Sequence, residues 1–437
     1  MAAQTAATRF RTGHAAHAAG SAALWLSLRP PAQRMKFAGH GGTIKASRHP
    51  THAGRIVMTS TSVVDLAREL AAQVATRADA ADKNGRLPAE DVQALKESGY
   101  LAISVPQAYG GRAATLRECV EAQLELAQGS GSTAMVATMP IHMIGAARES
   151  RQWSDEHYER LCRILIDGGL INSCASEPAL GSPSRGGVFH THAVKTDDGY
   201  IVNGHKNWST GGAHLTHLLV SLSLDGDVAQ FLIPNHAPGI RWEPTWCNAL
   251  SLRASDSDDV YFEDVVVPAE NLLKRSGTSN GKPGPNAWFP LLTAATYLGV
   301  ALSARRDTIQ FALDRVPTAL GKPIATLPKI QRQIGEMDVA LQAARLMLLD
   351  AASAWDQHTA DAWPRVVAAK QFANDTAISV TDMAMRVVGG QAITGALPFG
   401  RYYRDVRGSI THPPSGDTAL EIVGRAAIDQ LSNRDES

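Results

Sequence analysis

The sequence predicts an α+β protein of several domains: an N-terminal helical domain, a middle β-barrel or β-sandwich domain, and a C-terminal four-helix bundle. Three observations lead to this order. Apolar residues recur at three-to-four spacing through residues 60–168, as they do in amphipathic helices. Short β-rich runs separated by turn residues fill residues 170–267. Long helical patterns follow a Gly/Pro/Ser-rich linker at residues 276–285. The expected domains are therefore 58–169, 170–275 and 285–434.

The N-terminal domain is expected to contain only helices and one long loop. The helical pattern covers residues 63–83, about 87–99, 115–129, 132–149 and 155–168. Pro88 stands at an early helical position, where its missing N–H costs little. Residues 101–111 form a loop that ends in a Gly pair.

The middle and C-terminal domains differ in their periodicity. Strands are expected at residues 199–204, 216–222 and 260–267. Four long helices are expected afterwards, at about residues 287–315, 325–357, 361–388 and 416–433. The sequence contains no internal repeat.

The composition excludes several classes of protein. Of the 437 residues, 44% are hydrophobic and 19% are charged, and the formal net charge is zero, so no global field favours nucleic acid or an anionic membrane. The 4 cysteines show no CxxC spacing, which favours reduced thiols in a cytosol-like compartment. No apolar run approaches the roughly 18 residues that span a bilayer. We expect a cytoplasmic protein without a metal site.

The first 57 residues form a leader with a composition of its own. It contains no Asp or Glu, and it is rich in Ala, His and Gly. Its basic residues are Arg9, Arg11, Arg29, Arg34, Lys36, Lys45, Arg48 and Arg55. An acid-free, Arg-rich leader is typical of organelle transit peptides, which would place the protein in the mitochondrial matrix. A disordered tail, or sequence upstream of a start at Met58, would look the same.

Six short motifs follow one another in a fixed order after the leader. They are the 88–111 segment ending in VPQAYGG, Ser176-Glu177-Pro178 with Gly181-Ser182, the pattern G-x-K-x-W-x-T-x-G from Gly204 to Gly212, Arg253-Ala-Ser-Asp256, Phe262–Pro268, and Gly389-Gly390 with Arg404-Asp405. Together they resemble the acyl-CoA dehydrogenase superfamily over about residues 60–433. The resemblance implies a flavin-dependent oxidoreductase, usually a dimer or tetramer, whose cofactor site spans subunits.

The resemblance also implies which residues hold the flavin. They are Ser173, Ala175, Ser176, Ser182, Trp208, Ser209, Thr210, Gly389, Gly390 and Ser415. Thr210 would lie near flavin N5 and Ser176 near the pyrimidine edge, and Gly389-Gly390 would let a neighbouring subunit approach the dinucleotide. Such hydroxyls beside a flavin ring would tune its electronics. A Ser/Gly turn beside a core Trp, and a helix C-cap at Gly389, would give the same residues.

The resemblance implies FAD as the cofactor, but one position departs from the family pattern. The family usually has an Arg before a T-F-G-K segment, and this Arg binds FAD across a subunit interface. Here the segment is residues 316–322, and the Arg position is Pro317. FMN, or reduced flavin supplied by a reductase, therefore stays open.

The residue that should remove the substrate α-proton is also missing. Most family members carry a Glu after the Arg-Asp helix, and here that position is Pro413. The alternative position, near residues 287–292, has no acid either. General-base catalysis needs a titratable group within hydrogen-bond reach, so His412, Asp417 and His142 are the catalytic candidates. Asp417 could instead cap the last helix, and either histidine could be structural.

Three functions follow from these residues. The first is an acyl-CoA dehydrogenase that oxidises an acyl-CoA-like substrate, transfers hydride to flavin N5, and passes electrons to an electron-transfer flavoprotein. The second is a two-component flavin monooxygenase, a class that resembles this chain in its Arg-Asp…His-x-Pro context. Such an enzyme would take a hydrophobic organic substrate and would receive reduced flavin from a reductase. His412 would then support a flavin hydroperoxide. The third is a non-catalytic binding protein that keeps the fold.

Overall fold

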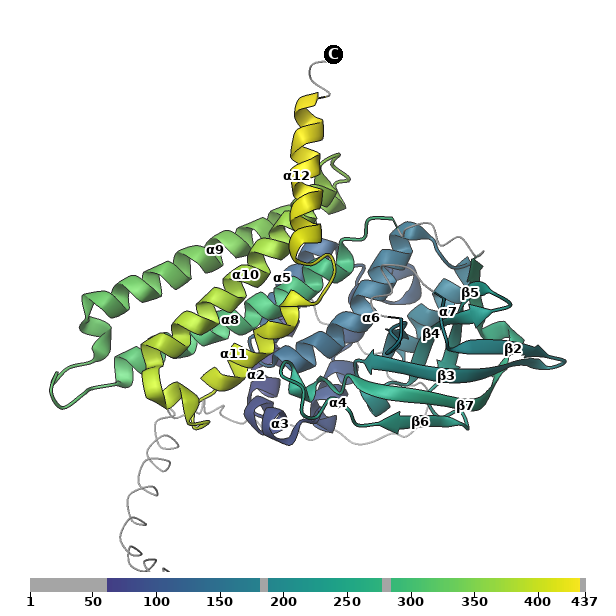
Figure 1. Cartoon of the computed structure of the whole chain (residues 1–437), viewed down its shortest axis with the longest axis horizontal. Coiled ribbons are helices and arrows are strands. Elements are labelled where there is room, and N and C mark those ends of the chain that lie inside the picture. Colours follow the sequence, from purple (N-terminus) through teal and green to yellow (C-terminus); the bar gives the residue numbers. More distant parts are fainter. Residues whose placement is uncertain (1–60, 181–187, 277–283, 433–437) are drawn as a thin grey trace, which may run out of the picture. The chain divides into compact units, whose positions relative to one another are not determined.

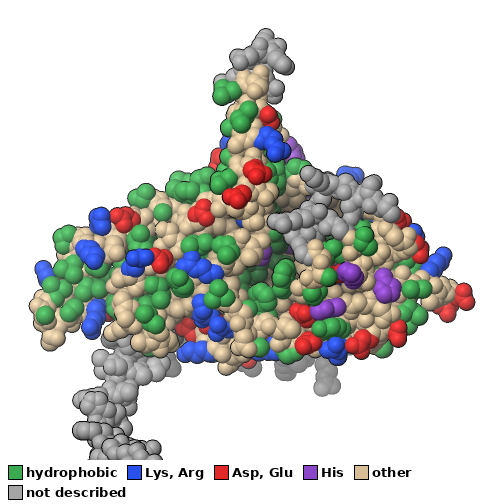
Figure 2. Space-filling model, in the orientation of Figure 1, with side chains coloured by type: hydrophobic (Ala, Val, Ile, Leu, Met, Phe, Trp, Pro, Cys, Tyr) green, Lys and Arg blue, Asp and Glu red, His purple; other side chains and the backbone are tan. Residues whose placement is uncertain are grey.

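The structure is a computed structural model that describes residues 61–180, 188–276 and 284–432. The expected order of helices, sheet and helices is confirmed (Figure 1). The leader at residues 1–57 lies outside the described residues, as does most of the linker at 276–285. Charges of both signs are interspersed on the face shown in Figure 2, in keeping with the zero net charge. Among the described residues, no helix is long and apolar enough to cross a membrane.

The N-terminal helices are short apart from one. They are α2 (Val63–Ala75), α3 (Ala78–Asn84), α4 (Ala89–Glu97), α5 (Leu116–Ala127), α6 (Gly131–Ser150) and α7 (Asp155–Ile166), with single 3₁₀ turns at Tyr100–Ala102 and Gln107–Tyr109. Residues 63–83 thus form two helices, and the expectation of one was wrong. The break lies at Arg77, which pairs with the buried Asp91 at 2.6 Å.

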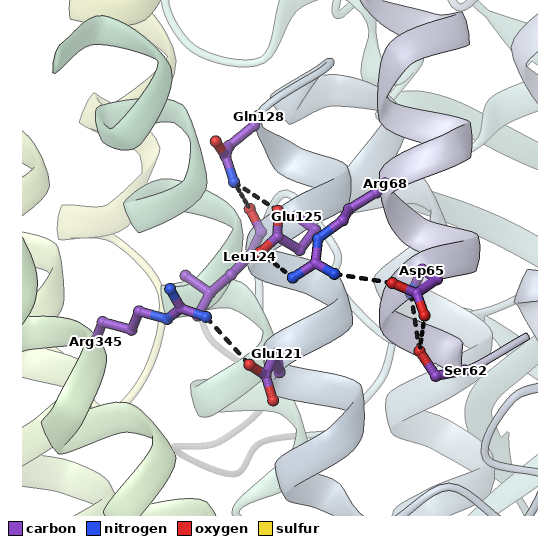
Figure 3. Close-up of polar contacts among 8 residues, drawn as sticks. All are labelled: Ser62, Asp65, Arg68, Glu121, Leu124, Glu125, Gln128 and Arg345. Atoms are coloured by element: carbon purple, nitrogen blue, oxygen red, sulfur yellow. Dashed lines mark hydrogen bonds and ion pairs between the residues drawn. The ribbon is translucent and has the colours of Figure 1, made fainter. Parts of the chain in front are cut away.

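Helix α5 is joined to its two neighbours by charged pairs on the surface (Figure 3). Arg68 of α2 contacts Asp65 at 2.9 Å and Glu125 of α5 at 3.4 Å. On the other side, Arg345 of α9 (Pro328–Asp356) contacts Glu121 at 3.1 Å. Exposed pairs of this kind are each worth about 0–1 kcal/mol. The apolar residues that α2 and α5 bury between them therefore provide most of the packing energy.

The middle domain is one eight-stranded sheet rather than two separate layers. Its order is β6-β7-β3-β2-β4-β5-β8, and β1 also pairs with β4. The strands are β1 (Ile171–Cys174), β2 (His192–Thr196), β3 (Gly199–Ser209), β4 (His217–Leu224), β5 (Asp227–Pro234), β6 (Ile240–Glu243), β7 (Asp258–Pro268) and β8 (Leu272–Ser276). The pairs β1–β4 and β2–β4 are parallel, and the other pairs are antiparallel.

Two strands share one edge of β4, and this arrangement creates the loop that matters for the site. β1 pairs with residues 217–220 of β4, whereas β2 pairs only with Ser223 and Leu224. The chain therefore leaves the sheet after Cys174 and returns to the same edge at His192. The segment 175–191 between them carries the Ser176-Glu177-Pro178 motif.

The C-terminal domain contains the four long helices that were expected, and a short one between the last two. They are α8 (Trp288–Asp314), α9, α10 (Ala362–Val388), α11 (Phe399–Asp405) and α12 (Gly416–Ser432). Helices α8, α9 and α10 lie side by side (Figure 1). α12 projects away from them, and Ala419 is its one buried residue within the described part of the chain.

Helix α11 connects all three domains through the Arg-Asp motif. Arg404 pairs with Asp82 of α3 through both terminal guanidinium nitrogens, Nη1 at 2.9 Å and Nη2 at 2.5 Å. Asp405 is buried and accepts a hydrogen bond from the backbone N–H of Leu252 at 3.0 Å. Ser251 also donates to the Asp405 carbonyl. The C-terminal helices are thereby tied both to the N-terminal helices and to the loop before β7.

Candidate active site

The loop that leaves β1 runs beside the end of β3. The backbone N–H of Asn207 donates to the carbonyl of Ser176 at 3.1 Å, which fixes the loop next to Trp208. Ser173, Ala175 and Ser176 are all half-buried, so their side chains or backbone remain accessible from one side. Ser182, the fourth predicted flavin contact in this loop, lies outside the described residues.

Glu177 anchors this loop through three hydrogen bonds. Its carboxylate accepts hydrogen bonds from Lys206 Nζ at 2.6 Å, from the His190 backbone at 2.7 Å and from the Thr191 backbone at 3.0 Å. Burial works against its ionised form, but the bonds from Lys206, Thr191 and His190 outweigh burial and hold the pKa of Glu177 below its usual value. Burial lowers the pKa of Lys206. Glu177 thus ties both ends of the 177–190 excursion to β3.

Glu177 and Lys206 both belong to the sequence motifs, but the motifs alone predict no role for either residue. The sequence did contain a signal for this pair. Side chains along a strand alternate between its two faces, so a lysine within a strand can point into the interior. Lys206 is fully buried, and a buried ammonium requires a partner. Its partner, Glu177, lies in the Ser176-Glu177-Pro178 motif.

Trp208 is the most exposed part of the β3 motif. It has a positive φ of 56° and is 56% exposed, which is unusual for a large aromatic residue. Ser209 beside it is buried. The Thr210 hydroxyl lies 2.8 Å from that of Ser257, and Asn172 donates to the Thr210 carbonyl at 3.0 Å. The bend at Trp208 therefore turns the indole outward while Ser209 and Thr210 stay attached to the domain.

The two histidines singled out in the sequence lie on the same aromatic ring. His142 of α6 and His412 both make edge contacts with Phe289 of α8, with ring centroids 5.0 and 5.6 Å apart. His412 Nδ1 is also 3.1 Å from the hydroxyl of Tyr297. Residues 270 positions apart in the chain thus contact the same side chain.

Burial favours the neutral form of both imidazoles. Burial lowers the pKa of His142 to about 4. Burial, followed by the charge of Lys370, lowers the pKa of His412 to about 4. The Nδ1 atom of His142 is buried without a hydrogen-bond partner, so it is free to meet a polar group of a ligand.

The remaining catalytic candidate, Asp417, lies apart from the histidines' contacts. It is exposed in the first turn of α12. Ser415, before it, is half-buried. Among the described residues, His412 contacts aromatic rings, a tyrosine hydroxyl and a lysine, and no carboxylate. Asp405 is buried nearby, but its carboxylate is bound to the Leu252 backbone.

Gly389 and Gly390 stand at the far end of α10. Nineteen residues separate Gly389 from Lys370, which contacts the His412 segment, so the two points lie roughly 28 Å apart along the helix. Both glycines are exposed, and a Cβ at either one would meet no atom within 4 Å. Within one chain they cannot serve the same part of a ligand as His412.

An arginine does precede the Gly321-Lys322 pair, although not at the expected position. Arg315 ends α8 and is exposed, two residues before Pro317. The backbone N–H groups of Leu320 and Gly321 both bond to the Pro317 carbonyl, so residues 317–321 form a tight turn.

These residues fit a flavin. An exposed Trp offers an aromatic wall, and the adjacent loop offers half-buried hydroxyls and backbone groups close to one edge of that wall. α6, which carries His142, packs directly against β1. Met143 and Ile144, which follow His142 in α6, share a buried apolar cluster with Ile171 of β1. Among the described residues, no group of His, Cys, Asp and Glu could hold a metal ion.

The fold and this site define a flavin-dependent oxidoreductase. Three family models cover the chain in order: acyl-CoA dehydrogenase N-terminal domain at residues 59–158, middle domain at 172–265, and C-terminal domain at 290–428. The putative acyl-CoA dehydrogenase YdbM of Bacillus subtilis is 34% identical over 352 residues, which are 80% of this chain and 92% of that protein. The chain belongs to the acyl-CoA dehydrogenase family.

Solved structures share the fold at lower identity. Butyryl-CoA dehydrogenase from Megasphaera elsdenii is 23% identical, with a TM-score of 0.72 over 84% of this chain and 97% of that one. Methanesulfinate monooxygenase MsuC from Pseudomonas fluorescens is 24% identical, with the same TM-score and coverage. The fold thus occurs both in a dehydrogenase and in a monooxygenase, and the choice between them has to come from the site.

Proposed function

We propose that this protein is a flavin-dependent monooxygenase in which the neutral imidazole of His412 serves the reactive side of the flavin. One observation carries the proposal. By resemblance, Pro413 takes the position of the usual base, and the described residues in contact with His412 are Tyr297, Phe289 and Lys370, with no carboxylate among them. A neutral imidazole can donate or accept a hydrogen bond without holding a charge.

The cofactor and partners follow from the same site. Trp208, Thr210 and the loop at Ser173–Ser176 would hold the flavin ring, which supplies the redox chemistry when bound. A separate reductase would supply reduced FAD or FMN. Gly389-Gly390 and Arg315, remote from His412 within one chain, would serve the cofactor of another subunit, which favours a homodimer or homotetramer. Phe289 and Tyr297 favour a hydrophobic organic substrate. We place the enzyme in the cytoplasm, or in the mitochondrial matrix if the leader is a transit peptide.

An acyl-CoA dehydrogenase is the second candidate, and the similarity to the putative dehydrogenase YdbM favours it. His412 or Asp417 would then accept the α-proton, and an electron-transfer flavoprotein would take the electrons. In that case a base other than Glu would have to act at a site whose nearest charge is positive.

Rapid-mixing spectroscopy of one preparation separates the candidates. A monooxygenase mixed with reduced flavin and oxygen should give a transient absorbance that differs from both reduced and oxidised flavin. A dehydrogenase should lose its yellow colour when an acyl-CoA is added without oxygen, and this result would overturn the proposal. If neither signal appears over a panel of acyl chains, the non-catalytic alternative gains support.

Two matched variants assign the chemistry to its residue. His412→Asn should shorten the transient roughly threefold to tenfold, because a hydrogen bond is worth about 0.5–1.5 kcal/mol. Asp417→Asn, five residues further on and exposed, should leave it unchanged. An equal effect of both variants would contradict the role given to His412.

A further inference from the structure

Lys370 is an unusual lysine, because it is buried in the middle of α10 and only 1% exposed. Lysine is almost never fully buried unless it has a partner. Its Nζ donates to two backbone carbonyls, those of His412 at 2.8 Å and Pro414 at 2.7 Å. Burial lowers the pKa of Lys370 to about 8, and the nearby charge of Asp375 opposes this shift.

The segment that Lys370 holds lacks two backbone donors. Pro413 and Pro414 have no backbone N–H to donate. One turn further along α10, the buried Asn374 donates from Nδ2 to the Ser409 carbonyl at 3.1 Å. Residues four apart on a helix lie on one face, so a single face of α10 holds the segment from Ser409 to Pro414 through three carbonyl oxygens.

His412 is therefore held from two sides. The backbone is held by Lys370 of α10, and the ring is held at Nδ1 by Tyr297 of α8. The titratable groups packed around it are Lys370, Tyr297 and, across Phe289, His142. Asp375 acts on Lys370, and Asp405 of α11 acts on Tyr297. The one charge acting on His412 among these described groups is the positive charge of Lys370.

We propose that Lys370 is a positioning residue of this site: it fixes the His412–Pro414 segment through two carbonyls and disfavours proton uptake by the imidazole. The inference rests on the proposed function and deepens it. A base that removes a substrate proton becomes an imidazolium, and a second positive charge beside a buried ammonium is unfavourable. A group that only exchanges hydrogen bonds does not meet this penalty. Lys370 thus favours the reaction class in which His412 stays neutral.

Histidine NMR of the full chain, with and without added flavin, tests this directly. The signal of His412 is identified by its loss in His412→Asn. In the wild type, this signal should show no titration between pH 5 and 8. In Lys370→Met, which keeps length but removes the charge, its midpoint should move from about 4 toward the ordinary 6.5. Asn374→Ala, which releases a carbonyl without changing charge, should leave the midpoint in place.

Two results would overturn the proposal: a wild-type His412 that titrates near 6.5, or a Lys370→Met midpoint equal to that of the wild type. If Lys370→Met does not fold, Lys370→Gln is used in its place. If neither variant folds, the titration of His412 in the wild type decides the question. The proposed function fails separately, through unchanged activity in His412→Asn, and that outcome leaves the titration interpretable. In the flavin-loaded enzyme, Lys370→Met should also shift the pH profile of turnover to higher pH. Replacing a purely structural lysine would not shift this profile.

Discussion

Lys206 Nζ lies 2.6 Å from Glu177 Oε1, and both side chains are buried beneath the loop that carries Ser176. Removing one member of a buried pair leaves an uncompensated charge, which typically costs about 3–5 kcal/mol. We expect Glu177→Gln or Lys206→Met to lower the free energy of unfolding by this amount, measured by urea denaturation. The double variant should recover part of the loss.

The control for this pair is exposed. Asp382→Asn breaks the Arg386–Asp382 contact on α10, where the side chains are 72% and 42% exposed, respectively, and should cost at most about 1 kcal/mol. Because the pKa of Glu177 is lowered in the folded protein, the contribution of this carboxylate is present above its usual pKa of 4.5 and is lost as the pH falls below it. Equal losses in the buried and exposed variants would show that burial does not set the energy.

Trp208→Ala should weaken flavin binding without unfolding the protein. The indole is more than half exposed, so its removal opens no cavity in the core. Aromatic contacts contribute about 0.5–1.5 kcal/mol beyond the area that they bury, so a loss of roughly threefold to tenfold in affinity is expected. Fluorescence titration with FAD and FMN measures it. Val266→Ala, another exposed apolar residue of the same sheet, is the control and should bind flavin normally.

Tyr297→Phe should slow turnover while preserving the fold. It removes the hydroxyl that lies 3.1 Å from His412 Nδ1, and one hydrogen bond is worth about 0.5–1.5 kcal/mol, or roughly a threefold to tenfold change in rate. Tyr402→Phe is the matched control, because its buried hydroxyl bonds to Asp307 at 2.6 Å, away from the histidines. A control variant that slowed turnover just as much would argue against a specific role for Tyr297.

Asp405→Asn should change how stability depends on pH. Burial, the largest effect, raises the pKa of Asp405 from 3.8 to about 6 in the folded protein. The folded state thus binds this proton more tightly than the unfolded state, and stability should fall as the pH rises from about 4 to about 6, by up to about 3 kcal/mol. Asn, which still accepts from Leu252, should flatten this part of the curve in thermal unfolding. Parallel curves for variant and wild type would refute the assignment.

The order of the domains and most long helices could be predicted, because they depend on local periodicity. The division between α2 and α3 could not, because it depends on Arg77 reaching Asp91, a residue of another helix. The single sheet was equally hidden, since a strand sequence does not reveal that β1 and β2 share one edge of β4.

The site was only partly predictable for the same reason. His142 and His412 were found because their residue type is chemically distinctive, and the structure brings both to Phe289. Lys370 was not found, because a lysine in a helical pattern usually points to solvent. The role of Lys370 depends on the fold, which brings the backbone carbonyls of His412 and Pro414 within hydrogen-bond distance of its Nζ.

The shared edge of β4 has a consequence for how this enzyme can change. The register of β1 is fixed by residues 217–220, and that of β2 by Ser223 and Leu224 and by its long pairing with β3. Insertions or deletions between Pro178 and Val188 therefore alter neither register, provided that Glu177 still reaches the backbone at His190 and Thr191. Selection, or a designer, can vary the length of this segment while the sheet stays the same.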